Sequence, residues 1–215
     1  VYVREGRRLE GLYFFTAHDA LPLSEGARPP LHNTSITASH YALDSHAVLK
    51  REKGRIHLDG FFSHPTAVYT VPYGVMVPKS IGNLLFPVAV SGSHVGFSTL
   101  RMEPCWMALG EAAGIAAGLA IENSKDVQNI SIETLQNKLL TNGAILVYLR
   151  DMKIDDSDYV LVQKLALQGF FPDWDAGLDN TLDKDTAQLW SKLSGKQIIS
   201  NGRTTKRQAI QSLEF

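Results

Sequence analysis

The stretch that most constrains this chain is residues 100–122, LRMEPCWMALGEAAGIAAGLAIE, which reads as one long helix with few charges. Pro104 suits the first turn of a helix, where a missing N–H costs nothing and the ring presets φ. Gly110, Gly114 and Gly118 recur every four residues and so share one face. Each costs about 1 kcal/mol relative to alanine inside a helix. This cost predicts that the glycine face packs closely against a neighbouring element or a ligand.

The length of the segment also fits a membrane span. Against a span, Glu111 would cost roughly 3 kcal/mol at the bilayer centre, and alanine and glycine add little hydrophobic gain. A buried core helix is therefore the favoured interpretation.

A core helix alone does not explain the preceding segment, SGSHVGFSTLRMEP. A strand, a turn of small residues and a helix start form an anion site, because free N–H groups and the positive end of the helix dipole converge there. Such a site suits a phosphate or an anionic ring edge.

A chain of 215 residues is long enough for one large or two small domains. The net charge of −1 gives no reason to expect nucleic acid or an anionic membrane surface as a partner. Cys105 is the single cysteine, so no disulfide can form within the chain. A helix start lowers the pKa of a thiol, but most cysteines in such apolar surroundings are inert, and we expect Cys105 to be inert. The chain starts VYVREGRRLEG, without Met or a signal-peptide pattern. We interpret it as a piece of a longer protein of unknown localisation.

The pattern changes from strands to helices along the chain. The pattern of residues 7–21 predicts a strand or strand pair. Residues 66–78 have the pattern of short or edge strands broken by prolines. Residues 83–94 have the pattern of a strand buried on both faces. After residue 124 the pattern is helical. The helix signals there are Ser131 as an N-cap, Asn142-Gly143, Gly169 and Gly195 as stops, and a last helix after Thr204. The predicted domains are residues 1–122 and a helical appendage of residues 123–215.

Four blocks in order carry a resemblance to a known family. They are GRRLEGLYFFTAHDAL, SITASHYALDSH, VPYGVMVPKSIGNLL and SGSHVGFSTLRMEPCWMALGEAAGIAAGLA. Over about residues 4–122 they resemble the C-terminal half of FAD-dependent oxidoreductases of the glutathione-reductase-like superfamily, in a group sometimes labelled xanthan-lyase related. The resemblance implies an α/β fold, or α+β for the fragment alone. Its expected parts are a strand-rich substrate-domain segment and the final strand and long helix of the nucleotide-binding layer, followed by the helical appendage.

The resemblance also implies a cofactor, FAD, whose flavin side faces the helix start. The implied cofactor-binding residues are Ser93, His94, Arg101, Met102, Glu103 and Pro104. His94 is also the candidate catalytic residue, as a neighbour of the flavin or a proton donor to substrate. The alternatives are a turn histidine bonded to backbone for His94, and a salt bridge with Glu103 or Glu111 for Arg101.

Two features depart from the family pattern. The G-x-G-x-x-G turn that cradles the pyrophosphate is absent from these residues, and LLFPVAVSGSH lacks the Gly-Arg that many relatives carry before the turn. We therefore expect the N-terminal half of the parent to be the partner that holds most of the FAD. The chain alone is expected to lack FAD and a complete active site, and to self-associate through exposed apolar surface.

The substrate is expected to be a small molecule or a carbohydrate. Residues 159–195 resemble a surface-layer-homology repeat, which implies cell-wall or carbohydrate association. The rival function is therefore a non-catalytic or carbohydrate-binding module of a polysaccharide-processing surface protein.

The segment HYALDSH places His40, Asp44 and His46 close together. These residue types can bind a metal, but no further ligands follow at metal-site spacing. The resemblance implies a comparable Asp-x-His in the substrate-facing domain, so a polar site or a structural role is the favoured interpretation, and no metal is predicted.

Overall fold

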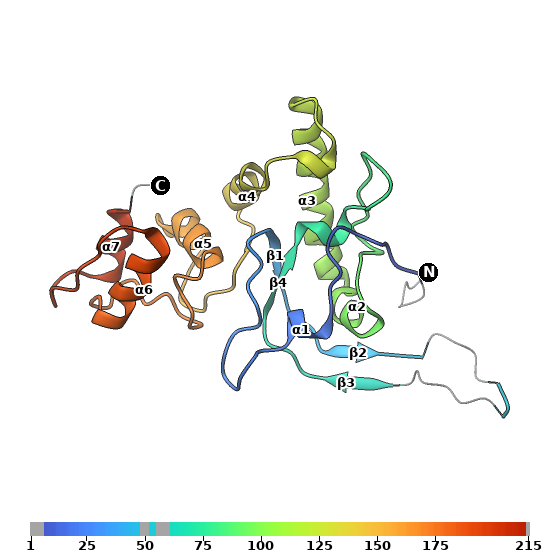
Figure 1. The fold of residues 1–215 in the computed structure, drawn as a ribbon, viewed down its shortest axis with the longest axis horizontal. Helices are drawn as coiled ribbons and strands as arrows, with labels where there is room; N and C mark the ends of the chain where they lie inside the picture. The colour runs from blue at the N-terminus through green and yellow to red at the C-terminus, as the bar shows by residue number, and fades with distance from the viewer. Residues whose placement is uncertain (1–6, 48–51, 55–60, 214–215) are drawn as a thin grey trace. The chain divides into compact units, whose positions relative to one another are not determined.

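The computed structural model describes residues 7–47, 52–54 and 61–213. The chain divides into two compact units, Val1–Tyr148 and Leu149–Phe215. Short strands and helices mix in the first unit, and the second is helical (Figure 1). This content agrees with the predicted α/β class. The unit boundary follows residue 148, whereas the sequence pattern placed it after residue 122.

The described residues of the first unit form two small antiparallel sheets. In one, β1 (Ser35–Ser39) pairs with β4 (Tyr69–Pro72), and in the other, β2 (Leu43–Ser45) pairs with β3 (Phe62–His64). β4 is buried along its whole length and ends at a proline, as the sequence predicts, before the short 3-10 helix η1 (Tyr73–Met76). By contrast, β3 is exposed at every position.

The strands predicted for residues 7–21 and 83–94 are wrong. Over these two stretches, which are described throughout, the structure has only isolated bridges, such as Phe15 with Gly92, and the four-residue helix α1 (Ala17–Ala20). The second stretch begins with Asn83 at a φ of 53°, a left-handed conformation that a strand cannot use. Phe86 and Val88 are also 39% and 36% exposed, whereas Val90 is buried. The run therefore lacks the two-sided burial on which the prediction depended.

Glycines make the closest backbone approaches between residues 11–16 and their neighbours. A Cβ added at Gly96 would lie 2.5 Å from the Phe15 carbonyl oxygen, and one at Gly92 would lie 2.9 Å from the same atom. A Cβ at Gly11 would lie 2.7 Å from the carbonyl oxygen of Gly74. These distances are too short for any side chain, so these positions require glycine.

The predicted long helix is present as α3 (Glu103–Glu122), and a separate short helix, α2 (His94–Leu100), precedes it where the sequence predicted a turn. α2 ends at Arg101, and α3 begins after Met102, with Pro104 in its first turn as predicted. α3 packs against β1, against η2 (Val127–Asn129) and against α4 (Ile132–Thr141). The buried residues of α3 are Cys105, Leu109, Ala112, Ala116, Leu119 and Ala120.

The predicted close-packing role of the glycine stripe is wrong within this chain. A Cβ at Gly110, Gly114 or Gly118 would meet no described atom within 4 Å beyond the helix itself. Met107 and Ile121 on α3 are 75% and 81% exposed. The sequence period identifies the shared face correctly, but it cannot show which face meets a neighbour.

By length and composition α3 could cross a membrane, and 33% of its apolar stretch is buried. Core helices of soluble proteins meet the same two criteria, so this finding is weak support for a span.

α4 belongs to the first unit. Ser131 caps its start by accepting a hydrogen bond from the Thr134 N–H at 3.2 Å, as predicted. The Gln136 amide donates to the Ser35 carbonyl oxygen at 3.0 Å, and the Ala38 N–H donates to the Ile145 carbonyl oxygen at 2.7 Å. These bonds tie residues 132–145 to β1.

The second unit contains α5 (Tyr159–Leu167), α6 (Lys184–Ser194) and α7 (Lys206–Gln211). Gly169 and Gly195 follow the first two helices with positive φ, at the predicted stops. Trp190 is fully buried, and its Nε1–H donates to the Phe170 carbonyl oxygen at 2.8 Å.

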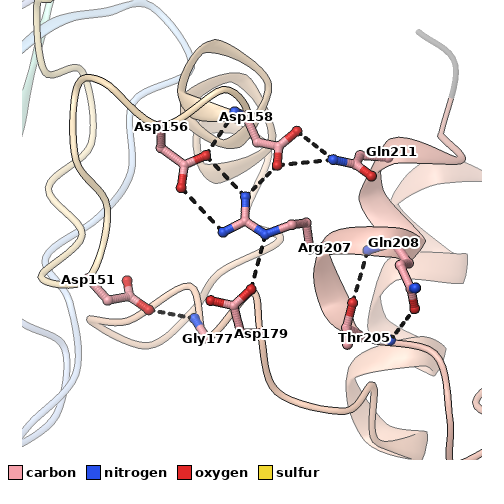
Figure 2. A network of polar contacts seen from close by, with 9 residues as sticks. All are labelled: Asp151, Asp156, Asp158, Gly177, Asp179, Thr205, Arg207, Gln208 and Gln211. Carbon is pink, nitrogen blue, oxygen red and sulfur yellow. Dashed lines mark hydrogen bonds and ion pairs between the residues drawn. The ribbon is translucent and has the colours of Figure 1, made fainter.

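One arginine connects three aspartates of the second unit (Figure 2). Arg207 on α7 donates to Asp156 at 3.0 Å and to Asp179 at 3.1 Å, and it also binds Asp158. Gln211, one turn later, donates to the same Asp158 at 2.9 Å. The entry to α5 is therefore held by the last helix.

Candidate functional site

The turn before α2 places His94 against the strand β2. Ser93 is the N-cap of α2, and its hydroxyl oxygen accepts a hydrogen bond from the Gly96 N–H at 2.9 Å. The His94 Nε2 atom lies 2.9 Å from the carbonyl oxygen of His46. A carbonyl oxygen only accepts, so this bond requires a proton on Nε2. The backbone-bonded alternative for His94 is therefore present in the structure.

Arg101 lies at the end of α2 and is only 2% exposed. Its Nη2 donates to the Asp44 carbonyl oxygen at 2.8 Å and to the Asp44 carboxylate at 2.9 Å. The salt-bridge alternative for Arg101 is therefore present, although the expected partners, Glu103 and Glu111, were wrong. The single nitrogen Nη2 therefore holds the backbone carbonyl and the side-chain carboxylate of Asp44 together.

The same Asp44 carboxylate lies 3.3 Å from Nε2 of His46. Asp44, His46, His94 and Arg101 thus form one group, which we call the His–Asp–Arg cluster. Two motifs about fifty residues apart in sequence meet here because β2 packs on α2. The side chains of His46 and Asp44 are 30% and 20% exposed and His94 is half-buried, whereas Arg101 is buried.

His40 lies outside this cluster, because its Nε2 bonds the Thr66 carbonyl oxygen at 3.1 Å. Within the part of the chain that the structure describes, no three His, Cys, Asp or Glu side chains are placed to hold a metal ion.

The start of α3 is accessible. Met102 is its N-cap, and Glu103 and Pro104 are exposed. The first N–H groups of a helix have no partner within it, and they sit at the positive end of the dipole. The Glu103 carboxylate already provides negative charge there. This helix start therefore fits the edge of a ring that accepts hydrogen bonds better than it fits a phosphate.

Cys105 follows in the first turn and is 5% exposed. Burial raises the pKa of its thiol to about 11, which outweighs the helix dipole. The thiol stays protonated near neutral pH, which is the state expected of an inert cysteine.

A second polar group, absent from the sequence expectations, connects α1 with the entry to β1. The Tyr13 hydroxyl donates to Asp19 Oδ1 at 2.6 Å and lies 2.9 Å from His32 Nε2, which is 3.1 Å from the same carboxylate oxygen. Nδ1 of His32 bonds the Thr70 hydroxyl at 2.8 Å. We call Tyr13, Asp19, His32 and Thr70 the Tyr–Asp–His network.

Asp19 is 8% exposed and carries the negative charge of this network. Burial alone would raise its pKa, but hydrogen bonds from His32, Tyr13 and Thr16 lower the pKa to about 2. Burial and the bond to Asp19 raise the pKa of Tyr13 well above its ordinary value. The Thr16-x-x-Asp19 spacing is a capping-box signal in the sequence, but nothing local to it indicates His32.

Comparison with known proteins adds one finding. A family model described as FAD dependent oxidoreductase matches residues 1–139. This range covers α1 to α3, the His–Asp–Arg cluster and most of α4. No curated protein and no solved structure matches the chain.

Proposed function

Since the chain belongs to the FAD dependent oxidoreductase family, we propose that it forms the part of a flavoprotein that meets the flavin end of FAD. The observation that carries this proposal is the accessible start of α3, with Glu103 and Pro104 exposed next to Arg101 of the His–Asp–Arg cluster. Backbone N–H groups of this first turn can donate to the edge of a flavin ring.

The six residues that the resemblance implies for FAD differ in what they can do. Met102, Glu103 and Pro104 present the helix start and would hold the cofactor. Ser93 and Arg101 are engaged in capping and in the bond to β2, so they would position the turn. We assign the pyrophosphate contacts to a separate dinucleotide-binding segment, because its glycine-rich turn is absent from these residues.

When bound, FAD supplies hydride or electron transfer. The chain's own residues orient one another's side chains and hold protons at defined atoms. Nε2 of His94 carries a proton and donates it in a hydrogen bond to the His46 carbonyl oxygen. His46 and Asp44 are partly exposed and are the members able to exchange a proton with a substrate. Arg101 binds the Asp44 carboxylate at 2.9 Å, and this carboxylate in turn lies 3.3 Å from Nε2 of His46 and orients its ring.

The proposed partner is the N-terminal half of the parent, which carries the glycine-rich turn. The exposed side of α3 supports this partner, because Met107 and Ile121 leave apolar surface uncovered and the glycine stripe leaves room for close backbone approach. In the absence of the partner, the same surface would favour self-association.

The proposed substrate is related to carbohydrates. The resemblance to a group labelled xanthan-lyase related supports it, as does the resemblance of residues 159–195 to a surface-layer-homology repeat. The alternative, a non-catalytic or carbohydrate-binding module, applies best to residues 149–215, since this unit has a buried core of its own.

Nuclear magnetic resonance of the labelled chain tests the flavin-end proposal. We expect riboflavin and FAD to shift the amide signals of residues 93–105 with similar affinity, which is too weak for the isolated chain to retain FAD through purification. We expect ADP to leave these signals unchanged. ADP carries the pyrophosphate but no flavin, so it is the matched control. Shifts caused by ADP and FAD but not by riboflavin would mean that the chain meets the adenosine and pyrophosphate end of FAD instead of the flavin end. The absence of shifts with riboflavin, FAD and ADP alike would contradict the proposal.

A further inference from the structure

A hollow of about 410 Å³ lies on the second unit, lined by one side of α6 and by residues 198–200, which follow that helix without regular secondary structure. All of its lining residues belong to this one unit. Its volume falls in the range of ligand sites. The hollow is therefore a candidate binding surface apart from the sites of the first unit.

Hydrogen bonds on either side of Ile199 fix this segment. The Ile198 N–H donates to the Ser191 hydroxyl oxygen at 2.9 Å, and this oxygen lies 3.3 Å from the Ile198 carbonyl oxygen. The Ser200 hydroxyl donates to the Leu182 carbonyl oxygen at 2.7 Å. A ligand would therefore meet a segment that is already ordered, and binding would not have to supply that order.

Ile199 itself is left open between these two anchors. Among the residues that the structure describes, its backbone N–H and carbonyl oxygen have no hydrogen-bond partner, and the residue is 67% exposed. An extended peptide that lies along the segment can exchange two main-chain hydrogen bonds with one such residue, as an added strand does at a sheet edge.

Lys184 and Gln188 supply polar donors to the hollow. They lie one turn apart on α6, and both line the hollow. Neither side chain has a hydrogen-bond or ion-pair partner among residues 7–47, 52–54 and 61–213. An ammonium and an amide N–H both donate, so together they can bind one carboxylate.

The acidic residues next to Lys184 in sequence do not line the hollow. Asp183 caps α6 by accepting a hydrogen bond from the Thr186 N–H at 2.7 Å, and it lies 3.7 Å from Lys206 Nζ. Asp185 lines a different hollow. Lys184 is thus the charged group among the described lining residues, and its charge favours a ligand that carries a carboxylate.

The apolar part of the lining is aliphatic, from Ala187, Ile198 and Ile199. No aromatic ring is among the described lining residues, so a planar ring finds no surface for stacking. A branched aliphatic side chain would instead bury apolar area against the two isoleucines.

We propose that this hollow binds an extended acidic peptide of a partner protein, with a glutamate and branched aliphatic residues at alternate positions. The main chain of the peptide pairs with Ile199, its carboxylate binds Lys184 and Gln188, and its aliphatic side chains cover Ile198 and Ile199. The site does not use flavin and lies in the other unit, so it stands or falls separately from the proposed function.

Titration of the labelled full chain with the peptide acetyl-Val-Thr-Glu-Thr-Val-amide tests the site by nuclear magnetic resonance. Its two valines and its glutamate alternate, so they share one face of an extended strand. We expect saturable shifts at the amides of Gln188, Ile198 and Ile199 with a Kd of about 1 mM, as for a short peptide. The Ile199 amide proton should move downfield, because it gains an acceptor.

A paired substitution isolates the charge contact. Lys184→Gln should weaken binding of the glutamate peptide by about threefold, the size expected of an exposed ion pair. The same peptide with Gln in place of Glu should bind the parent chain about threefold more weakly and should not respond to Lys184→Gln. Ile199→Ala should weaken both peptides by about threefold through lost apolar contact.

Lys153→Gln is the matched control, because Lys153 is an exposed lysine of the same unit outside the hollow, and it should leave binding unchanged. Lys184 and Ile199 are exposed, so their variants should keep the thermal melt of the parent chain. Equal binding of the two peptides, or the absence of saturable shifts at these amides, would overturn the site. Glucuronate binding as tightly as the glutamate peptide would mean that the hollow takes an acidic sugar, and this too would overturn the assignment.

Discussion

Asp19→Asn should destabilise the first unit by about 2 kcal/mol at neutral pH. The pKa of Asp19 falls from 3.8 to about 2 on folding. One pKa unit corresponds to about 1.4 kcal/mol, which gives the estimate. The side chain is only 11% exposed, so solvent screens the interaction little. The variant loses the charge while the Tyr13 hydroxyl and the Thr16 N–H still face that position, at 2.6 Å in the parent structure.

The sign of the pH dependence follows from the lowered pKa. The charge of Asp19 stabilises the fold above pH 3.8, and this contribution disappears as the pH falls through about 2. The free-energy gap between parent and variant should therefore be constant from pH 7 to about pH 5 and close at lower pH.

Urea unfolding followed by the amide signals of residues 15–20 and 69–77 measures this gap in the first unit alone. Asp175→Asn is the control, because Asp175 forms an exposed pair with Arg150 in the second unit. A gap below about 0.5 kcal/mol at pH 7, or a gap of the same size at pH 3, would show that the network does not stabilise the charged carboxylate.

Three further predictions concern single substitutions. Gly96→Ala should lower the melting temperature of the first unit, because the added Cβ would lie 2.5 Å from a backbone oxygen. Gly114→Ala should leave the melting temperature unchanged or raise it through helix propensity. Equal melting temperatures for the two variants would contradict this difference between the two glycines. Arg101→Ala should cost about 3–5 kcal/mol in urea unfolding, because it leaves a partly buried carboxylate without its cation, and a loss under 1 kcal/mol would refute this role. Arg207→Gln should expose α5 to amide hydrogen exchange, and protection at the parent level would show that the three aspartates do not need the cation.

Local chemistry predicted the ends of helices well. Pro104, Ser131 and Gly195 act within one turn of their own position, so their effect is visible in a short segment. The strand predicted at residues 83–94 failed because burial on two faces depends on neighbours that the segment itself does not contain. The glycine stripe failed for the same reason, since a period identifies a face but not its partner.

The candidate site shows the same division. His94 and Asp44 were identified by residue type and motif, but their meeting depends on β2 packing against α2. The Asp44–Arg101 pair joins residues 57 apart, so a search for partners nearby in sequence gave Glu103 and Glu111 instead. His32 reaches Asp19 from 13 residues away through a loop without regular structure, for which no periodic pattern exists.

The Arg207 network has a consequence for proteolysis of the second unit. Arg207 and Gln211 lie near the end of the chain, yet their partners Asp156 and Asp158 stand at the entry to α5. A protease that removed α7 would leave these carboxylates facing one another with no cation between them. Their repulsion would loosen α5 and expose new cleavage sites. A single cut after residue 200 would therefore lead to cleavage of the whole unit. Limited digestion should accordingly show intact unit or small peptides, with no long-lived trimmed form.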